Sequence, residues 1–337
     1  MNGRSPHRIS CVVSGGATSG EHPASVERVT TAIPLTVSVP TARLRDDLGT
    51  LPDGVEVVIW DMKDAAPRAR FDMVVPPYMS MDGVIEALST VEVGLVQSQS
   101  IGYDNVEGRL PEGLVFANAS SVHETATAEL AVALTLAAQR RLPDFVRAQD
   151  RGEWTGGGAA GLADRRVTLL GFGGVGRAIA ARLKPFEVDL RAVASHGRLQ
   201  DEVEVFPLGK LSEVLAATDI LIASLPGGDA TRHIIDDAAL SALPDGALIV
   251  NVGRGPLVDT DVLVDHVRRG RIRTALDVTD PEPLPAGHPL WSLEGALVVP
   301  HVGGATDAMH PRIARLVRRQ IDRLRAGEEP LNIVIGG

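Results

Sequence analysis

The chain has little cysteine, no long hydrophobic run and no excess of positive charge, and each of these absences narrows what it can be. Its single cysteine, Cys11, can form neither an intramolecular disulfide nor a zinc site built from cysteines. No apolar run reaches the roughly 18 residues that a membrane-spanning helix needs, and the first residues lack an apolar core of signal-peptide length. We therefore expect a cytoplasmic protein with no membrane partner.

The charge balance argues against nucleic acid as a partner. The formal net charge is −10 at pH 7, whereas phosphate backbones attract basic surfaces. One local exception is the arginine-rich segment 312–325, whose apolar residues Ile313, Leu316, Val317 and Ile321 recur at helical spacing. This spacing predicts a packed helix with a solvated arginine face.

The length and the pattern of apolar runs predict two α/β domains. The chain has 337 residues, which is long for one hydrophobic core. Residues 1–33 show no steady periodicity, and we expect a poorly ordered extension there. Short apolar runs at 35–39, 55–60, 73–75 and 93–98 predict strands, with a helix at 81–90 between two of them. Strands that alternate with helices are typical of a parallel sheet.

A long helix and a second series of strands follow. The sequence Ser121-Val122-His123-Glu124 has the form of a capping box and predicts a helix start, and Pro143 predicts its stop. A glycine-rich stretch at 152–165 leads into apolar runs at 166–171, 190–195, 219–226, 247–253, 274–278 and 296–301. These runs are almost continuously apolar, which predicts strands buried on both faces in a doubly wound sheet.

A glycine-rich motif connects the first of these strands to a helix. Residues 171–176 read GFGGVG, which fits the GxGxxG pattern of dinucleotide-binding loops. The pattern alone is weak, and a plain strand-to-helix turn without ligand is the alternative. Here a strand leads into the loop, and Val175, Ile179 and Leu183 at helical spacing follow it, so we expect the helix N-terminus to face a pyrophosphate.

Three reactive side chains follow three of the predicted buried strands. Arg254 follows 247–253, Glu282 follows 274–278, and His301 comes just after the apolar residues 296–299. Each alone has an ordinary structural explanation. Together, beside a dinucleotide loop, they offer a cation for a carboxylate, a titratable acid and base, and a carboxylate to orient it.

At these residues the chain resembles the D-isomer-specific 2-hydroxyacid dehydrogenases. The likeness runs from about residue 70 to 325 and is carried by GYDNV (102–106), the glycine loop, SLP (224–226), NVGRG (251–255), DVTDPEPLP (277–285), HPLW (288–291) and PHVGGAT (300–306). It implies two doubly wound parallel-sheet domains. A Rossmann coenzyme domain, 120–304, would be inserted in a flavodoxin-like substrate domain, 34–119 and 305–337. It also implies a homodimer with the helix 120–141 and its following arm at the interface.

The resemblance further implies a role for each motif. Arg254 would bind the substrate carboxylate, His301 would be the acid/base, and Glu282 would be its partner. Asp277 matches the position that contacts the nicotinamide carboxamide. The implied coenzyme contacts are Gly171, Gly173, Gly174, Val175, Gly176, Ser195, His196, Arg198, Leu225, Pro226, Val252, Gly253, Arg254, Asp277, His301 and Gly303. The implied substrate contacts are Tyr78, Met79, Ile101, Gly102, Tyr103, Arg254 and His301, and no metal is expected.

The sequence departs from NAD-using relatives at the end of the second coenzyme-domain strand. An Asp or Glu normally binds the adenosine ribose there, about 20 residues past the loop. Here Ala194 is followed by Ser195, His196 and Arg198, which can donate hydrogen bonds to a 2′-phosphate. We therefore expect NADP(H) to be preferred over NAD(H); the alternative is that Arg198 is solvated and NAD is used without an acidic anchor.

The predicted activity is hydride transfer between NAD(P)(H) and a small 2-oxo acid or D-2-hydroxy acid of the glyoxylate/hydroxypyruvate type. Glu282 disfavours formate dehydrogenases, which have glutamine at this position, and the lack of lysine in 74–80 disfavours phosphite dehydrogenases. Two alternatives stay open: an NAD-using enzyme like phosphoglycerate dehydrogenase, and a non-catalytic NAD(H)-sensing protein like the co-repressors.

Overall fold

Two β-sheets, each covered by helices, make up the part of the chain that the computed structural model describes: residues 34–79, 83–104, 106 and 108–336. The predicted N-terminal extension 1–33, with Cys11, lies outside these residues. Within them, no helix has both the length and the apolar character needed to cross a bilayer.

The first sheet forms around the apolar runs near the N-terminus. Its strands are β1 (Leu35–Val39), β2 (Val55–Ile59), β3 (Arg70–Val74), β4 (Glu92–Gln97), β5 (Phe116–Ala117) and β14 (Ile333–Ile335). The order is β14-β5-β4-β3-β1-β2, and all neighbours are parallel except β14, which is antiparallel to β5. Without β14 this is the flavodoxin-like order.

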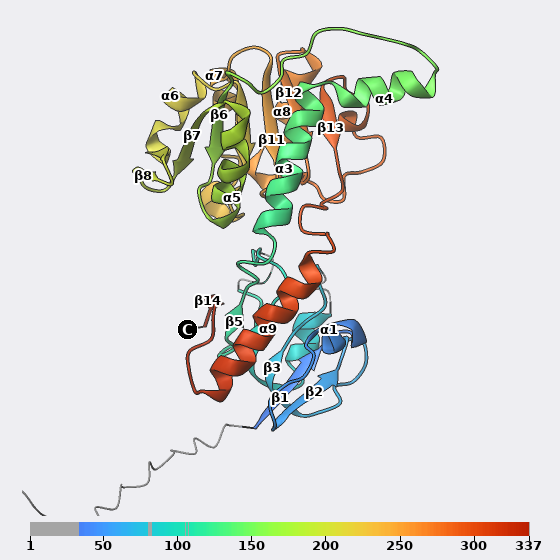
Figure 1. Ribbon diagram of the computed structural model, residues 1–337, viewed down its shortest axis with the longest axis vertical. Coiled ribbons are helices and arrows are strands. Elements are labelled where there is room, and N and C mark those ends of the chain that lie inside the picture. Colours follow the sequence, from blue (N-terminus) through green and yellow to red (C-terminus); the bar gives the residue numbers. More distant parts are fainter. Residues whose placement is uncertain (1–33, 80–82, 105, 107, 337) are drawn as a thin grey trace, which may run out of the picture. The chain divides into compact units, whose positions relative to one another are not determined.

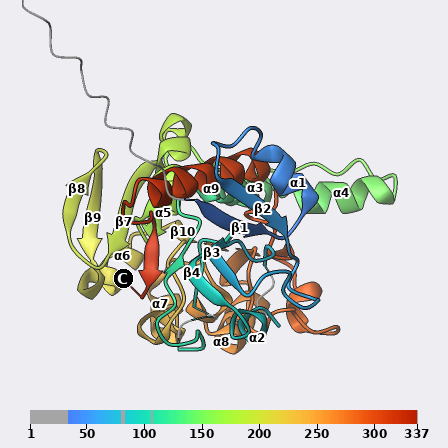
Figure 2. The ribbon, with the colours of Figure 1, turned by 90° about the horizontal axis from the view of Figure 1, so that it is seen from below.

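Helices cover both faces of the first sheet (Figure 1). Helices α1 (Ala42–Asp47) and α9 (Met309–Arg325) share one hydrophobic cluster with β1, and α2 (Val84–Leu88) belongs to a second cluster with Trp60 and Phe71. Figure 2 shows α9 beside α1 and the strands. The prediction of a solvated arginine face on α9 is wrong in part, because Arg312 and Arg318 donate to backbone carbonyls of Val122 and Thr50.

The second sheet is the larger one and confirms the predicted series of strands, although the edge strand β13 and the first half of β7 are not buried as predicted. Its strands are β6 (Arg166–Leu170), β7 (Asp189–Ala194), β8 (Arg198–Gln200), β9 (Val203–Pro207), β10 (Ile220–Ala223), β11 (Ala247–Asn251), β12 (Ile272–Leu276) and β13 (Ala296–Val298). The order is β13-β12-β11-β10-β6-β7-β9-β8, parallel except for β8 against β9. Apart from β8, this is a Rossmann order, with its switch point between β6 and β10.

Two helical layers enclose this sheet. Helices α3 (Glu124–Gln139) and α5 (Gly174–Leu183) pack in one hydrophobic cluster, and α6 (Leu211–Leu215), α7 (Asp237–Ala242) and α8 (Thr260–Arg268) pack in the other. Helix α4 (Leu142–Asp150) follows α3. Short 3₁₀ turns lie at Lys184–Phe186, Leu208–Lys210, Asp229–Thr231, Gly255–Leu257 and Pro289–Trp291.

The start of α3 differs from the predicted capping box. The N-cap is His123, while Ser121 has a φ of 81° and lies outside the helix. Only half of the box forms: Glu124 accepts a hydrogen bond from the Ser121 N–H at 2.6 Å, and the Ser121 hydroxyl caps nothing in return. At the other end, α3 stops at Gln139, and Pro143 lies in the first turn of α4, where a missing N–H costs nothing.

Candidate active site

The predicted reactive residues lie at one edge of the second sheet, where its parallel strands have their carboxyl ends. Arg254 lies just beyond β11, Asp277 directly follows β12, and His301 lies just beyond β13. Gly171 directly follows β6 at the neighbouring switch point. Parallel strands end at a common edge, so residues far apart in the chain are brought near the glycine loop.

The glycine loop has the geometry that a pyrophosphate requires. Gly171 has a φ of +104°, and a Cβ on Gly176 would lie 2.2 Å from the Gly171 carbonyl oxygen, so both positions need glycine for the turn and for close helix packing. A Cβ on Gly173 would meet no atom within 4 Å, which leaves the space above the loop open. Gly174 and Val175 begin α5, whose first turn has no acidic residue. A helix N-terminus of this kind attracts a phosphate group.

Two further loops line the same edge. Leu225 and Pro226 follow β10, and the Pro226 carbonyl accepts a hydrogen bond from Thr231 at 2.9 Å. Val252 is buried after β11, and the Gly253 N–H donates to the Asn251 side chain at 3.0 Å. These contacts fix the loops on which the predicted coenzyme residues lie.

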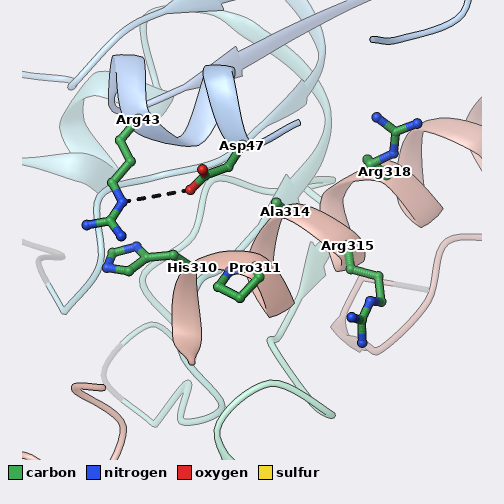
Figure 3. Close-up of a pocket in the computed structure, with 7 residues that line it drawn as sticks. All are labelled: Arg43, Asp47, His310, Pro311, Ala314, Arg315 and Arg318. Carbon is green, nitrogen blue, oxygen red and sulfur yellow. Dashed lines mark ion pairs between the residues drawn. The ribbon is translucent and has the colours of Figure 1, made fainter. Parts of the chain in front are cut away.

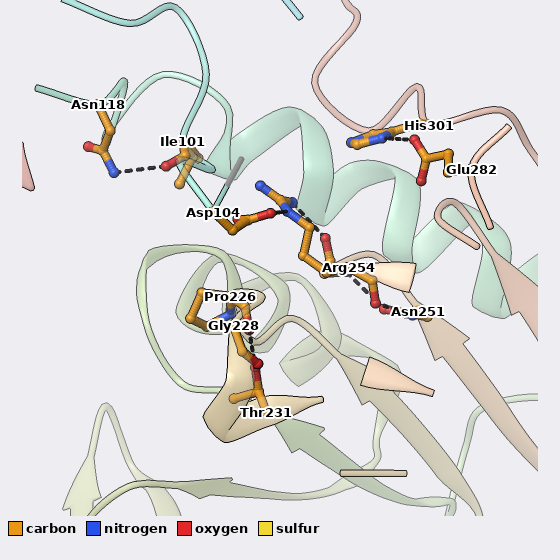
Figure 4. A network of polar contacts seen from close by, with 11 residues as sticks. Ile101, Asp104, Asn118, Pro226, Gly228, Thr231, Asn251, Arg254, Glu282 and His301 are labelled. Carbon is orange, nitrogen blue, oxygen red and sulfur yellow. Dashed lines mark hydrogen bonds and ion pairs between the residues drawn. The ribbon is translucent and has the colours of Figure 1, made fainter. Parts of the chain in front are cut away.

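His301 and Glu282 form a close pair. The His301 Nδ1 lies 2.5 Å from Glu282 Oε1, and both side chains are part exposed (Figure 4). A carboxylate only accepts hydrogen bonds, so Nδ1 carries the proton in this pair and Nε2 is left for exchange with a substrate. The pair therefore has the arrangement of an oriented general acid/base.

Asp277 holds the loop that carries His301. Its carboxylate accepts hydrogen bonds from the Val302 N–H at 2.7 Å and the Gly303 N–H at 3.0 Å, and its carbonyl accepts one from the His301 N–H at 2.8 Å. Burial raises the pKa of Asp277, and the two backbone donors oppose that rise. The side chain is only 3% exposed, so its main contacts are within the protein.

Arg254 is held by residues of two loops, one following a strand of the first sheet and one following a strand of the second. Its Nε donates to both carboxylate oxygens of Asp104 at 3.2 Å (Figure 4). Its Nη1 donates to the Gly253 carbonyl at 2.7 Å. Its side chain is 26% exposed. The guanidinium is thus fixed and still accessible to an anion.

The predicted substrate residues differ in their surroundings. Tyr78 stacks on His123 with ring centroids 5.4 Å apart, and Ile101 and Gly102 lie in the loop that also carries Asp104. Burial raises the pKa of Tyr78; the Asp277 charge adds to the rise and Arg254 opposes it, which places Tyr78 within electrostatic reach of both. By contrast, Met79 is 51% exposed.

The remaining substrate candidate, Tyr103, contributes to a hydrophobic core. Its ring packs against the cluster that includes Phe71 and Phe116 on the α2 face of the first sheet. Part of this side chain is therefore engaged in packing.

The predicted adenosine-end residues lie around the turn between β7 and β8. Ser195 Oγ and His196 Nδ1 are 3.0 Å apart. Arg198 begins β8 and does not lie in a loop; its guanidinium donates to the His196 carbonyl at 3.0 Å and to the Phe172 carbonyl in the glycine loop at 3.4 Å. A cation thus lies between this turn and the glycine loop.

Several positioning residues were not predicted as site residues. Asn251 Nδ2 donates to the Arg254 carbonyl at 2.8 Å, and Asn118 Nδ2 donates to the Ile101 carbonyl at 2.9 Å. Asp104 belongs to the motif at 102–106 but was not predicted as a site residue, and its ion pair with Arg254 joins residues 150 positions apart in the chain. Asn118 directly follows β5 and Asn251 ends β11; a buried asparagine at the end of a strand is a usable signal, since its amide can shape the following loop.

A separate cavity of about 400 Å³ lies between α1 and α9, lined by Arg43, Asp47, His310, Pro311, Ala314, Arg315 and Arg318 (Figure 3). Arg318 is already bound to the Thr50 carbonyl, and none of the predicted site residues lines this cavity. Across the described ranges, no cluster of three or more potential metal ligands is present.

Known proteins resemble this chain in sequence and in fold. Residues 132–303 match the profile of the D-isomer specific 2-hydroxyacid dehydrogenase, NAD binding domain. A glyoxylate reductase from Thermococcus onnurineus is 30% identical over 84% of this chain and 91% of its own length.

Two solved structures are similar over nearly their whole length. A D-isomer specific 2-hydroxyacid dehydrogenase from Xanthobacter autotrophicus Py2, in complex with NADPH and MES, is 27% identical over 90% of this chain and 98% of its own, with a TM-score of 0.76. An NADPH-dependent glyoxylate/hydroxypyruvate reductase from Sinorhizobium meliloti, in complex with NADP and malonate, is 26% identical over the same shares, with a TM-score of 0.73.

Proposed function

The chain belongs to the D-isomer specific 2-hydroxyacid dehydrogenase family, and we propose that it reduces glyoxylate, hydroxypyruvate or a similarly small 2-oxo acid with NADPH. The observation that carries the proposal is the His301–Glu282 pair, which lies with Arg254 at the same strand ends as the glycine loop. Relatives named as glyoxylate reductases and the NADP-bound structure of a glyoxylate/hydroxypyruvate reductase support this substrate type.

In this proposal Arg254 binds the substrate carboxylate. A guanidinium has a planar edge that takes a carboxylate through two charge-assisted hydrogen bonds. Such a contact orients the adjacent 2-oxo group, because the two groups share a carbon–carbon bond. Tyr78, Ile101, Gly102 and Met79 would then surround the rest of a small substrate.

His301 would supply the proton. During reduction the 2-oxo oxygen becomes an alkoxide, and a protonated imidazole at Nε2 neutralises it; in the reverse direction the same nitrogen accepts the proton. Glu282 keeps the ring oriented through Nδ1 and stabilises the imidazolium. The bound nicotinamide coenzyme supplies the hydride, and the role of the protein is to position the two reactants.

The open space above Gly173 and the first turn of α5, which contains no acidic residue of its own, fit a dinucleotide pyrophosphate. NADP(H) is preferred in this proposal because Arg198 lies between the Ser195–His196 turn and the glycine loop. A charge-assisted contact to a 2′-phosphate is worth roughly 1.5–3 kcal/mol, or about one to two decades of preference. Arg198→Ala should therefore lower kcat/KM for NADPH by about tenfold and leave that for NADH within a factor of about two. Equal kcat/KM values for the two coenzymes in the wild type would contradict the preference.

We assign substrate binding to residues 34–119 and 305–337 and coenzyme binding to 120–304. We further propose a homodimer. Val146 on α4 and Trp154 beyond it are 57% and 102% exposed, respectively. A groove of about 1050 Å³ lies nearby, lined by residues that include Arg147, Ala159 and Trp291. The equivalent segment of a second copy would bury both the exposed side chains and the groove.

The deciding experiment is an activity screen of the purified protein against a panel of 2-oxo acids with NADPH and NADH. We expect turnover with glyoxylate and hydroxypyruvate and little with 3-phosphohydroxypyruvate. Coenzyme binding without turnover of any member would overturn the proposal and favour a coenzyme-sensing protein.

A further inference from the structure

We infer that Asp104 is a positioning residue for substrate binding, acting through Arg254. This inference rests on the proposed function, in which Arg254 binds the substrate carboxylate. Asp104 lies in the loop after β4, and Arg254 lies beyond β11, so each residue belongs to a segment from a different sheet. Their side chains are 35% and 26% exposed, so both face a site that a ligand can reach.

The bond pattern decides which edge of the guanidinium is free. A guanidinium has five N–H groups, one on Nε and two on each terminal nitrogen. Asp104 takes the Nε group with both oxygens at 3.2 Å, and the Gly253 carbonyl takes one Nη1 group at 2.7 Å. Three groups remain, one on Nη1 and two on Nη2. One of the Nη2 groups lies beside Nε, and the edge between Nη1 and Nη2 is one of the edges that can bind a carboxylate at two points.

Gly102 restricts the same end of the side chain. A Cβ at this position would lie 1.3 Å from Nη2 of Arg254, so the guanidinium occupies space that only glycine leaves open. The loop itself is held by Asn118, whose amide donates to the Ile101 carbonyl at 2.9 Å. Asp104 thus acts from a loop that is held at Ile101, with its carboxylate on Nε and the Gly102 backbone beside Nη2.

The pair has two consequences for substrate binding. An arginine side chain has considerable rotamer freedom, and holding Nε removes that freedom before the substrate arrives. The Asp104 charge also offsets part of the Arg254 charge and weakens its attraction for an anion, and in this inference the gain in orientation outweighs that loss. Asparagine at this position keeps an acceptor for Nε, whereas alanine removes it.

The test is steady-state kinetics of the full chain with glyoxylate and NADPH. Asp104→Ala should raise KM for the 2-oxo acid about tenfold while kcat and the KM for the coenzyme change less than about threefold. Asp104→Asn should stay within about threefold of the wild-type KM. Asp189→Ala, which removes an aspartate paired with Arg191 on β7, is the matched control and should change neither parameter.

A double-mutant cycle tests whether Asp104→Ala changes KM through Arg254 or independently of it. In an Arg254→Ala background, Asp104→Ala should change KM by less than about twofold, because the group that it positions is gone. An equal effect in both backgrounds, an unchanged KM in Asp104→Ala, or failure of Asp104→Asn to restore KM would overturn the inference while leaving the proposed function intact. A wild type that reduces no 2-oxo acid would overturn the proposed function first and this inference with it.

Discussion

His301 is the residue on which the proposed chemistry depends most. Its Nδ1 is occupied by Glu282 at 2.5 Å, so Nε2 is the only ring nitrogen left to exchange a proton. We expect His301→Ala to lower kcat by about 10² to 10⁴ and to leave the Kd for NADPH nearly unchanged. Steady-state kinetics measures kcat, and a fluorescence titration with NADPH measures the Kd. A variant with more than about a tenth of wild-type kcat would remove His301 from the mechanism.

Asp277 predicts a pH dependence of folding stability. Burial raises its pKa in the folded state above the ordinary value near 3.9, so the folded protein binds this proton more tightly than the unfolded chain does. The contribution of Asp277 to the free energy of unfolding is therefore largest at low pH. It falls as the pH rises from the pKa of the unfolded chain through the higher pKa of the folded protein. Asp277→Asn should flatten the profile over that window.

Urea unfolding of both proteins at a series of pH values between 4 and 7 measures this effect. The comparison uses the slopes, because asparagine also replaces one acceptor of the Val302 and Gly303 N–H groups with a donor and lowers stability at every pH. Parallel slopes in the two proteins would show that Asp277 does not titrate as described.

The strand–loop–helix unit formed by β6 and α5 allows packing and ligand binding to be separated. A Cβ on Gly176 would lie 2.2 Å from the Gly171 carbonyl oxygen, whereas one on Gly173 would meet nothing within 4 Å. Gly176→Ala should lower the free energy of unfolding by about 1–3 kcal/mol through overpacking.

Gly173→Ala is the matched variant and should unfold within about 0.5 kcal/mol of the wild type while its Kd for NADPH rises at least about tenfold, because the methyl group enters the space left for the pyrophosphate. Thermal unfolding and coenzyme titration of both variants give the result. Unchanged coenzyme affinity in Gly173→Ala would show that the pyrophosphate lies elsewhere.

The elements that sequence reasoning located are those buried on both faces. Strands β6, β10 and β11 are nearly all apolar because helices cover them on two sides, and this pattern can be read directly. Edge strands lack such a pattern. The β8–β9 hairpin, which contains Arg198, is not predicted from the sequence, because β8 pairs on one side only and has just three residues.

The same limit applies to the site. The glycine loop and the strand-end placement of Arg254 and His301 have local signatures, so the sequence could predict them. The Asp104–Arg254 pair could not be predicted, since it joins residues 150 positions apart and no local period encodes it. Likewise the Ser121 prediction failed because the chain takes a left-handed conformation there, which the four-residue motif does not specify.

At the scale of the whole molecule, the proposed homodimer depends on the segment around α4. Val146→Asp places a charge on a side chain that is 57% exposed in one copy and would be buried in a pair. Light scattering at micromolar concentration should give twice the chain mass for the wild type and the single mass for the variant. Leu199→Asp, on exposed β8, is the control and should keep the doubled mass. A monomeric wild type would contradict the proposal.

The three tryptophans give this protein a built-in optical signal. Trp60 is 4% exposed, Trp291 is 52% exposed and Trp154 is 102% exposed, so the indoles begin in very different solvent environments. A solvated indole emits at longer wavelength than a buried one. If a second copy covers Trp154 and the groove that Trp291 lines, the emission maximum should move to shorter wavelength as concentration rises, and Trp154→Phe should reduce that movement. Assembly could then be followed in real time without a label, at concentrations too low for scattering.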